Sequence, residues 1–217
     1  MKLLRSRRES TLEHRLVWQA AALLLTYPDE QHAERLTTVE EMLNHLPAAH
    51  ANLLASTVTA LRTKDPMQAQ VDYVDTFDMR RRTTMYLTYW TAGDTRNRGN
   101  HMLAFARAYR QAGVDPPRRE APDYLPVVLE FAATVDPEAG RRLLVEHRAP
   151  IDLLRDALEQ SASPYVHAVA AVCSTLPART EQDIQRAQRL AAAGPPTESV
   201  GLEPFTLTVP PRRAQGV

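Results

Sequence analysis

Cysteine and the residue patterns of metal sites are scarce in this sequence. Cys173 is the single cysteine among 217 residues, so the chain cannot form an internal disulfide. The apolar run around Cys173 predicts a small buried side chain and not a reactive thiol. No two of the seven histidines stand three or four positions apart, the spacing that directs two helical side chains at one metal. We therefore expect no metal site and no resident cofactor.

The sequence motifs of common enzyme classes are also missing. There is no glycine-rich phosphate-binding loop and no serine within a nucleophile-elbow pattern. These absences indicate that the protein is not an enzyme. An active site assembled from separate helices stays open as the alternative, because such a site leaves no local motif.

Neither sign of charge is in excess, with 26 Lys and Arg against 26 Asp and Glu. A general nucleic-acid binder depends on surplus positive charge, so nucleic acid is not an expected partner. The chain also lacks a long apolar run. The stretch 20–25 is too short to span a membrane and follows the charged residues Glu13 and Arg15, unlike a signal-peptide core. We expect a soluble, cytoplasmic protein with no direct membrane insertion.

Prolines are abundant, and their positions predict helices. Asp65-Pro66, Asp136-Pro137 and Ser163-Pro164 each pair a favoured N-cap with proline at the first helical position. Between the prolines, apolar residues recur with the helical period, and no strand pattern occurs in residues 1–193. The predicted helices are 10–27, 30–46, 48–64, 66–77, 85–90, 94–113, 126–135, 137–147, 150–160, 164–176 and 180–193.

The predicted fold is therefore all-α: a single-domain bundle of about ten helices over residues 10–193. The first helix is expected to begin at Ser10, with Glu13 completing a capping box. Residues 1–9 form a basic N-terminal lead, and the proline-rich residues 194–217 are expected to form a flexible C-terminal tail. Alternating residues at 205–209 leave open that part of the tail docks as an extended strip.

Arginine and aromatic residues gather in the segment 73–110, which contains seven arginines, no lysine and seven of the chain's aromatics. This combination is typical of protein-recognition surfaces. In the alternative interpretation the aromatics are core residues, and the arginines pair locally with Asp75, Asp78 and Asp94. Stacking on single-stranded nucleic acid is a third interpretation, which the zero net charge disfavours.

A second distinctive segment, 120–131, joins a stiff loop to the start of a helix. Asp123 stands near that start, where its carboxylate can cap free N–H groups or receive a basic group of a partner. From the residues alone a capped core helix is the favoured interpretation, although the spacing does not decide between the two.

These two segments contain a series of short motifs. The motifs are Tyr73-Val74-Asp75-Thr76-Phe77-Asp78, Tyr86-Leu87-Thr88-Tyr89, Gly93-Asp94-Thr95-Arg96 with Arg98-Gly99, Pro122-Asp123-Tyr124-Leu125-Pro126 and Leu129-Glu130-Phe131. In these motifs the sequence resembles the nitrate reductase delta subunit family, the NarJ-type molybdenum cofactor assembly chaperones within the wider TorD-like group. The clear resemblance covers about residues 70–135.

The sequence departs from the wider group's Glu-Pro-x-Asp-His signature within residues 120–124. Proline stands one place later, at Pro122, and Tyr124 replaces the histidine. This departure puts any histidine-dependent role in doubt but leaves Asp123 available.

The resemblance implies a TorD-like helical chaperone for assembly and maturation of respiratory nitrate reductase, with a role in nitrate assimilation. Such a protein binds the N-terminal peptide of the apo catalytic alpha subunit until molybdenum cofactor and iron–sulfur insertion, and is not part of the final enzyme. Further partners are the alpha–beta complex and cofactor-donor proteins. A chaperone of another twin-arginine-exported molybdoenzyme is the alternative. The residues expected to bind the client peptide are Arg82, Tyr86, Tyr89, Trp90, Pro122, Asp123 and Tyr124.

Overall fold

The computed structural model describes residues 2–93 and 98–195, and its side chains from residue 11 onward. Within these residues the chain forms eleven α-helices and no strand, which confirms the all-α prediction. The helices are α1 (Lys2–Leu25), α2 (His32–Leu43), α3 (Ala48–Arg62), α4 (Pro66–Tyr73), α5 (Tyr89–Ala92), α6 (Arg98–Gln111), α7 (Leu125–Thr134), α8 (Pro137–Glu146), α9 (Arg148–Gln160), α10 (Tyr165–Ser174) and α11 (Glu181–Ala193).

The first helix starts earlier than predicted. α1 begins at Lys2 and continues through Ser10, so the predicted start at Ser10 is wrong. The preceding residues are mainly leucine, arginine, lysine and glutamate, which are good helix formers and lack any breaker. The predicted tail, its strip at 205–209 and the predicted helix start at Asp94 lie outside the described residues.

The predicted N-caps are confirmed at two of three positions. The side chain of Asp65 accepts the amide N–H of Met67 at 2.9 Å, and that of Asp136 accepts the amide of Ala139 at 2.9 Å. The third prediction is wrong, because α10 begins at Tyr165 and the hydroxyl of Ser163 has no hydrogen-bond partner. An N-cap depends on only a few neighbouring residues, so the sequence predicts it correctly at Asp65 and Asp136.

The segment after α4 differs most from a regular helix. α4 passes into a π-helical turn, η1 (Val74–Asp78), and a 3-10 turn, η2 (Arg81–Thr83), follows. The compact helix predicted over 85–90 is instead an isolated bridge at Tyr86 and a turn at 87–88, followed by the short helix α5. This irregular chain is the part of the fold that forms the site described below.

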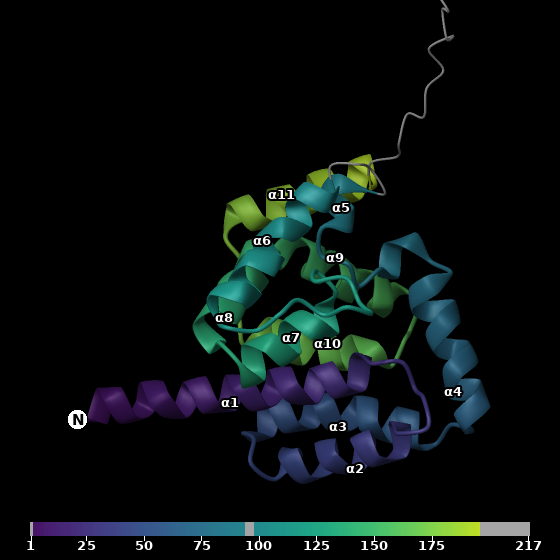
Figure 1. The fold of residues 1–217 in the computed structure, drawn as a ribbon. Helices are drawn as coiled ribbons and strands as arrows, with labels where there is room; N and C mark the ends of the chain where they lie inside the picture. The colour runs from purple at the N-terminus through teal and green to yellow at the C-terminus, as the bar shows by residue number, and fades with distance from the viewer. Residues whose placement is uncertain (1, 94–97, 196–217) are drawn as a thin grey trace, which may run out of the picture.

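Helix α1 is the centre of the bundle. It runs across the molecule with α2 and α3 on one side and α7 and α10 on the other (Figure 1). Its buried face contains Ala20 and Ala21, whose small side chains let the neighbouring helices approach. Trp18 is buried as well, and its indole Nε1 donates a hydrogen bond to the hydroxyl of Thr175 at 2.8 Å. This bond ties α1 to the end of α10.

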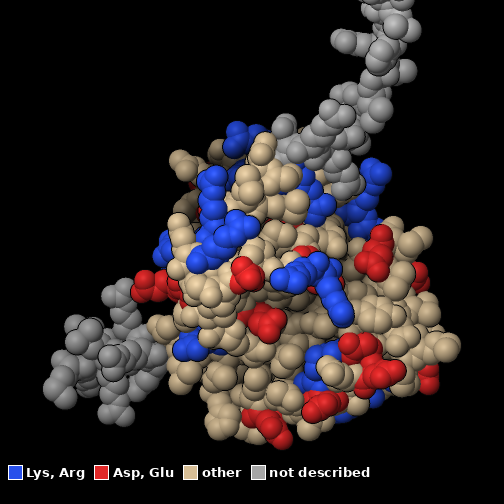
Figure 2. Space-filling model, viewed as in Figure 1, with Lys and Arg blue, Asp and Glu red and all other residues tan. Residues whose placement is uncertain are grey.

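Charge is unevenly distributed although the chain is neutral. On the face shown in Figure 2, basic side chains dominate over the end formed by α5, α6 and α11. Both signs mix over the opposite end, where α2, α3 and α4 lie. The zero net charge therefore hides a basic end next to α5.

Candidate functional site

Two segments far apart in the sequence pair directly in the structure. The amide of Leu87 donates to the carbonyl of Asp123 at 3.0 Å, and the amide of Leu125 donates to the carbonyl of Met85 at 2.9 Å. These two bonds form an isolated antiparallel bridge centred on Tyr86 and Tyr124. We call residues 85–88 and 122–125 the clip. It joins the two segments that the sequence singled out.

The carboxylate of Asp123 holds the clip together from the inside. Asp123 is fully buried, and its Oδ2 accepts hydrogen bonds from the amide of Thr88 at 3.1 Å and from the Thr88 hydroxyl at 2.6 Å. Its Oδ1 accepts no hydrogen bond from the residues that the structure describes and lies 3.7 Å from Nη2 of Arg98. A buried charge requires such partners, because its transfer out of water costs roughly several kcal/mol even after the protein relaxes around it. Asp123 therefore has an internal role, and its predicted contact with a client stays a prediction.

Arg98, the first residue of α6, covers the clip. Its guanidinium lies 4.7 Å from the ring centroid of Tyr86, a cation–π distance. The Tyr86 ring in turn lies 5.3 Å from that of Tyr124. Arg98 thus contacts an aromatic surface and faces a buried carboxylate at the same time.

A chain of hydroxyl groups anchors Tyr124 to the bundle. The Tyr73 hydroxyl donates to the carbonyl of Leu25 at 2.9 Å, so the Tyr124 hydroxyl is the donor in its 2.7 Å bond to Tyr73. Burial raises the pKa of both phenols above the ordinary value for tyrosine, which keeps both protons in place near neutral pH. The position of Tyr124 is therefore fixed against the end of α1.

Tyr109 of α6 anchors Pro122, which lies two residues before Tyr124 in the clip. Its hydroxyl donates to the carbonyl of Pro122 at 2.6 Å, and its ring packs 4.6 Å from that of Phe131. Burial raises the pKa of Tyr109, so the phenol stays a donor. Together these contacts make the clip a rigid platform between α1, α6 and α7.

The predicted site residues separate into two groups by exposure. Tyr86, Pro122 and Tyr124 are half-buried and present an aromatic surface, whereas Asp123 is buried. Tyr89 and Trp90, in α5 directly after the clip, are 7% and 4% exposed. The indole Nε1 of Trp90 is buried and has no hydrogen-bond partner within the described part of the chain.

Arg82 stands apart from the other predicted site residues. It is exposed and lines a separate pocket between η2 and the end of α9, where no clip residue lies. The structure therefore brings six of the seven predicted residues together in the clip and α5 and leaves Arg82 outside.

The core interpretation of the aromatics in the segment 73–110 is confirmed for all but one of them. Tyr86 is half-buried, and the other aromatic residues of the segment are buried. The same interpretation also expected the arginines of the segment to pair locally with Asp75 and Asp78, and this part is wrong, because neither aspartate forms an ion pair with an arginine among the described residues. Asp94 lies outside those residues.

Thr88, Arg98 and Tyr109 hold the clip in place but were not among the predicted site residues. Arg98 and Thr88 stand within the motifs that carried the resemblance, so a signal was present, but their partners are distant in sequence. Within the described residues no group of His, Cys, Asp or Glu could hold a metal ion. Of the helices that the structure describes, none has the length and apolarity to cross a membrane.

Comparison with known proteins identifies the family. The model of the nitrate reductase delta subunit family matches residues 39–171, a range that contains the whole clip. The chain belongs to this family. Among delta-family relatives, NarJ of Bacillus subtilis, named as a nitrate reductase molybdenum cofactor assembly chaperone, is 31% identical over 77% of this chain and 91% of its own length. The protein of the same name from Escherichia coli K12 is 32% identical over 65% of this chain and 61% of its own length.

A more similar relative is much longer than this chain. The nitrate reductase-like protein NarX of Mycobacterium tuberculosis is 61% identical over 74% of this chain, which spans 24% of NarX. A solved structure from Archaeoglobus fulgidus, described as that of a redox enzyme maturation protein, matches with a TM-score of 0.55 and 22% identity over 74% of this chain and 91% of its own. That likeness shows that this delta-family chain and the archaeal protein share a fold.

Proposed function

We propose that this delta-family protein is an assembly chaperone of respiratory nitrate reductase and not an enzyme. In this proposal it binds the N-terminal peptide of the apo catalytic alpha subunit, keeps that subunit open to molybdenum cofactor and iron–sulfur insertion, and then leaves. The family match and the names of the NarJ relatives support the chaperone role. The alpha–beta complex and cofactor-donor proteins are further proposed partners, and the proposed location is the cytoplasm.

The observation that carries the proposal is the half-buried aromatic face of the clip. An amphipathic client helix can lay its apolar side chains against Tyr86, Pro122 and Tyr124, which the bonds to Tyr73 and Tyr109 hold in place. A rigid aromatic surface binds with little loss of side-chain entropy, because its rotamers are already fixed. Tyr89 and Trp90, the first two residues of α5, follow directly after the clip and are buried.

Asp123 provides the proposed polar contact. Its Oδ1 accepts no hydrogen bond from the described residues and faces Arg98 at 3.7 Å, beyond hydrogen-bond distance. A basic residue of the client can therefore compete with Arg98 for this oxygen. Arg98 would then move off the Tyr86 ring and open the aromatic face to the client.

The expected affinity is moderate. Burial of two or three apolar anchors contributes about 1.5–3 kcal/mol each, and ordering of the peptide offsets part of it. The result is a Kd on the order of micromolar. Reversible binding of this strength suits a chaperone that must release its client.

Isothermal titration with a synthetic alpha-subunit N-terminal peptide tests this proposal. Saturable one-to-one binding is expected for the native peptide, with none for a scrambled peptide and weaker binding for a twin-arginine signal of another molybdoenzyme. Tyr86→Ala is expected to weaken binding about tenfold, because it removes one aromatic anchor. Val145→Ala, which truncates an exposed apolar residue on α8, is the matched control and should leave the Kd within twofold. Equal weakening by both variants, or no binding by the wild type, would refute the proposed site.

A further inference from the structure

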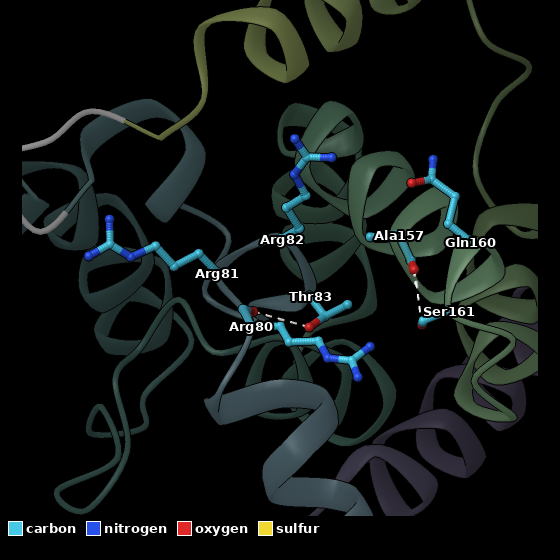
Figure 3. Close-up of a pocket in the computed structure, with 7 residues that line it drawn as sticks. All are labelled: Arg80, Arg81, Arg82, Thr83, Ala157, Gln160 and Ser161. Atoms are coloured by element: carbon cyan, nitrogen blue, oxygen red, sulfur yellow. Dashed lines mark hydrogen bonds between the residues drawn. The ribbon is translucent and has the colours of Figure 1, made fainter.

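A second concave site lies away from the aromatic face of the clip. Arg80–Thr83 form one wall of a pocket of about 400 Å³, and Ala157, Gln160 and Ser161 at the end of α9 form the other (Figure 3). No carboxylate belongs to the lining. A pocket of several hundred Å³ is in the usual range for small-molecule sites.

Some arginines of the surface form ion pairs, whereas the three arginines of this turn form none among the described residues. Arg35 pairs with Asp29, Arg62 with Glu40 and Arg155 with Asp156, each at 2.7 Å. No ion pair of Arg80, Arg81 or Arg82 occurs among the described residues, and all three side chains are exposed. Three neighbouring cations with no partner repel one another, so an anion bound here would relieve that repulsion.

The backbone that presents the arginines is fixed. Thr83 is 2% exposed, and its hydroxyl bonds to the carbonyl of Thr76 and, at 3.1 Å, to the carbonyl of Arg80. These bonds hold the turn η2 against the preceding π-helical turn. The positions from which Arg80 and Arg82 project are therefore set before any ligand arrives.

The arginines do not all face the pocket. In Figure 3 the side chains of Arg80 and Arg82 extend along the side of η2 that faces Ala157 and Ser161. Arg81 extends in the opposite direction, away from the end of α9. Arg80 and Arg82 therefore lie on the pocket side of the turn, whereas Arg81, which has the same charge and stands between them in sequence, points away from the pocket.

We propose that this pocket binds the phosphate or pyrophosphate group of a small molecule, held between Arg80 and Arg82. A planar guanidinium donates two parallel hydrogen bonds to phosphate oxygens, so two of them suit an anion with several oxygens better than a single carboxylate. The volume of about 400 Å³ exceeds what a phosphate alone fills, and Ala157 with the arginine stems offers an apolar wall for an attached organic group. The ligand class is therefore a phosphorylated organic molecule.

Titration with inorganic pyrophosphate at constant ionic strength tests the site, with chloride as the competing ion. Saturable one-to-one binding is expected for the wild type. Arg80→Gln and Arg82→Gln are each expected to weaken it about tenfold, as for the loss of one charge-assisted pair. Arg81→Gln is the matched control, because it removes the same charge from the same turn, and binding should stay within twofold.

Three results would overturn the proposal. The first is no saturable binding of pyrophosphate by the wild type. The second is equal weakening by all three variants, which would indicate only a general attraction by positive charge. The third is binding of an acidic peptide but not of pyrophosphate, which would assign the pocket to a polypeptide partner. Circular dichroism of each variant ensures that a loss of binding reflects the side chain and not the fold.

Discussion

Asp123 and Asp152 are both buried, and each faces at least one arginine, yet their surroundings differ. Asp152 of α9 is 1% exposed and accepts hydrogen bonds from Nε of Arg148 at 3.0 and 3.1 Å and from Nε of Arg179 at 2.8 Å. Asp123 accepts its hydrogen bonds from Thr88 on one oxygen, and its other oxygen faces Arg98 at 3.7 Å.

The difference indicates two roles for a buried carboxylate. Asp152 is saturated by two cations, and Arg148 also donates to the carbonyl of Pro177 at 2.7 Å, so this cluster fastens α9 to the segment that leads into α11. Asp123 keeps an acceptor oxygen that a further donor can use. Buried polar groups are usually satisfied in native proteins, and the incompletely satisfied oxygen of Asp123 is the one to which we assign the proposed client contact.

The largest expected difference between Asp152 and Asp123 is the loss of unfolding free energy when each carboxylate is removed. Asp152→Ala leaves two arginines without their partner, one of them buried, and we expect a loss of about 3–5 kcal/mol in the free energy of unfolding. Asp123→Ala leaves the Thr88 donors unpaired and should cost about 1–3 kcal/mol. Urea denaturation followed by circular dichroism measures both. A larger loss for Asp123→Ala would reverse the assignment of the two roles.

The reaction rate of the Cys173 thiol, which lies next to Asp152, also distinguishes the Asp152 site from the Asp123 site. Burial, followed by the nearby charge of Asp152, raises the pKa of Cys173 to about 12, and its Sγ lies 3.7 Å from the carboxylate. In the folded wild type, reaction with a disulfide reagent at pH 8 should therefore be slow. Asp152→Ala should accelerate it at least tenfold through local opening, whereas Asp123→Ala should leave the rate nearly unchanged. Equal acceleration in both variants would mean that the two sites open together.

Replacement of the arginine partners should distinguish the sites in client binding. Arg98→Gln frees Oδ1 of Asp123 and uncovers the Tyr86 ring, so we expect a Kd for the client peptide several-fold lower than in the wild type. Arg148→Gln is the matched control and should change the Kd less than twofold. Weaker peptide binding by Arg98→Gln would show that Arg98 contacts the client instead of competing with it.

The smallest expected effect is on the dependence of stability on pH. Burial lowers the pKa of His147, whose ring packs 4.7 Å from Phe105 of α6. The folded state therefore favours neutral His147. The stability that this neutral form contributes is present above the unfolded pKa of about 6.5 and is lost as pH falls through the lower folded pKa. His147→Gln should flatten the decline in unfolding free energy below about pH 6.5. An unchanged slope would exclude His147 as its cause.

The sequence predicted the features that depend on local pattern. The helical period and the caps at Asp65 and Asp136 involve residues a few positions apart, and the structure confirms them. The wrong start at Ser10 arose because a capping sequence can occur inside a longer run of good helix formers. Local pattern also singled out Asp123, but it did not predict that this side chain is buried.

The contacts that join distant segments were not predictable from one sequence. The bridge between Tyr86 and Tyr124 spans the two helices α5 and α6 in sequence, and the ion pair between Arg179 and Asp152 spans α10. No period or motif encodes such pairs. The predicted groove residues Tyr89 and Trp90 are aromatic at helical spacing, a pattern that core and binding residues share, and the structure places them in the core.

Hydrogen exchange of the backbone amides, with and without the alpha-subunit N-terminal peptide, examines client binding and its location together. We predict slower exchange with the peptide at residues 85–88 and 122–125 and no change around Asp152. A scrambled peptide should change neither region. Protection by the native peptide confined to other helices, with the clip unaffected, would contradict the proposal that the clip binds the client.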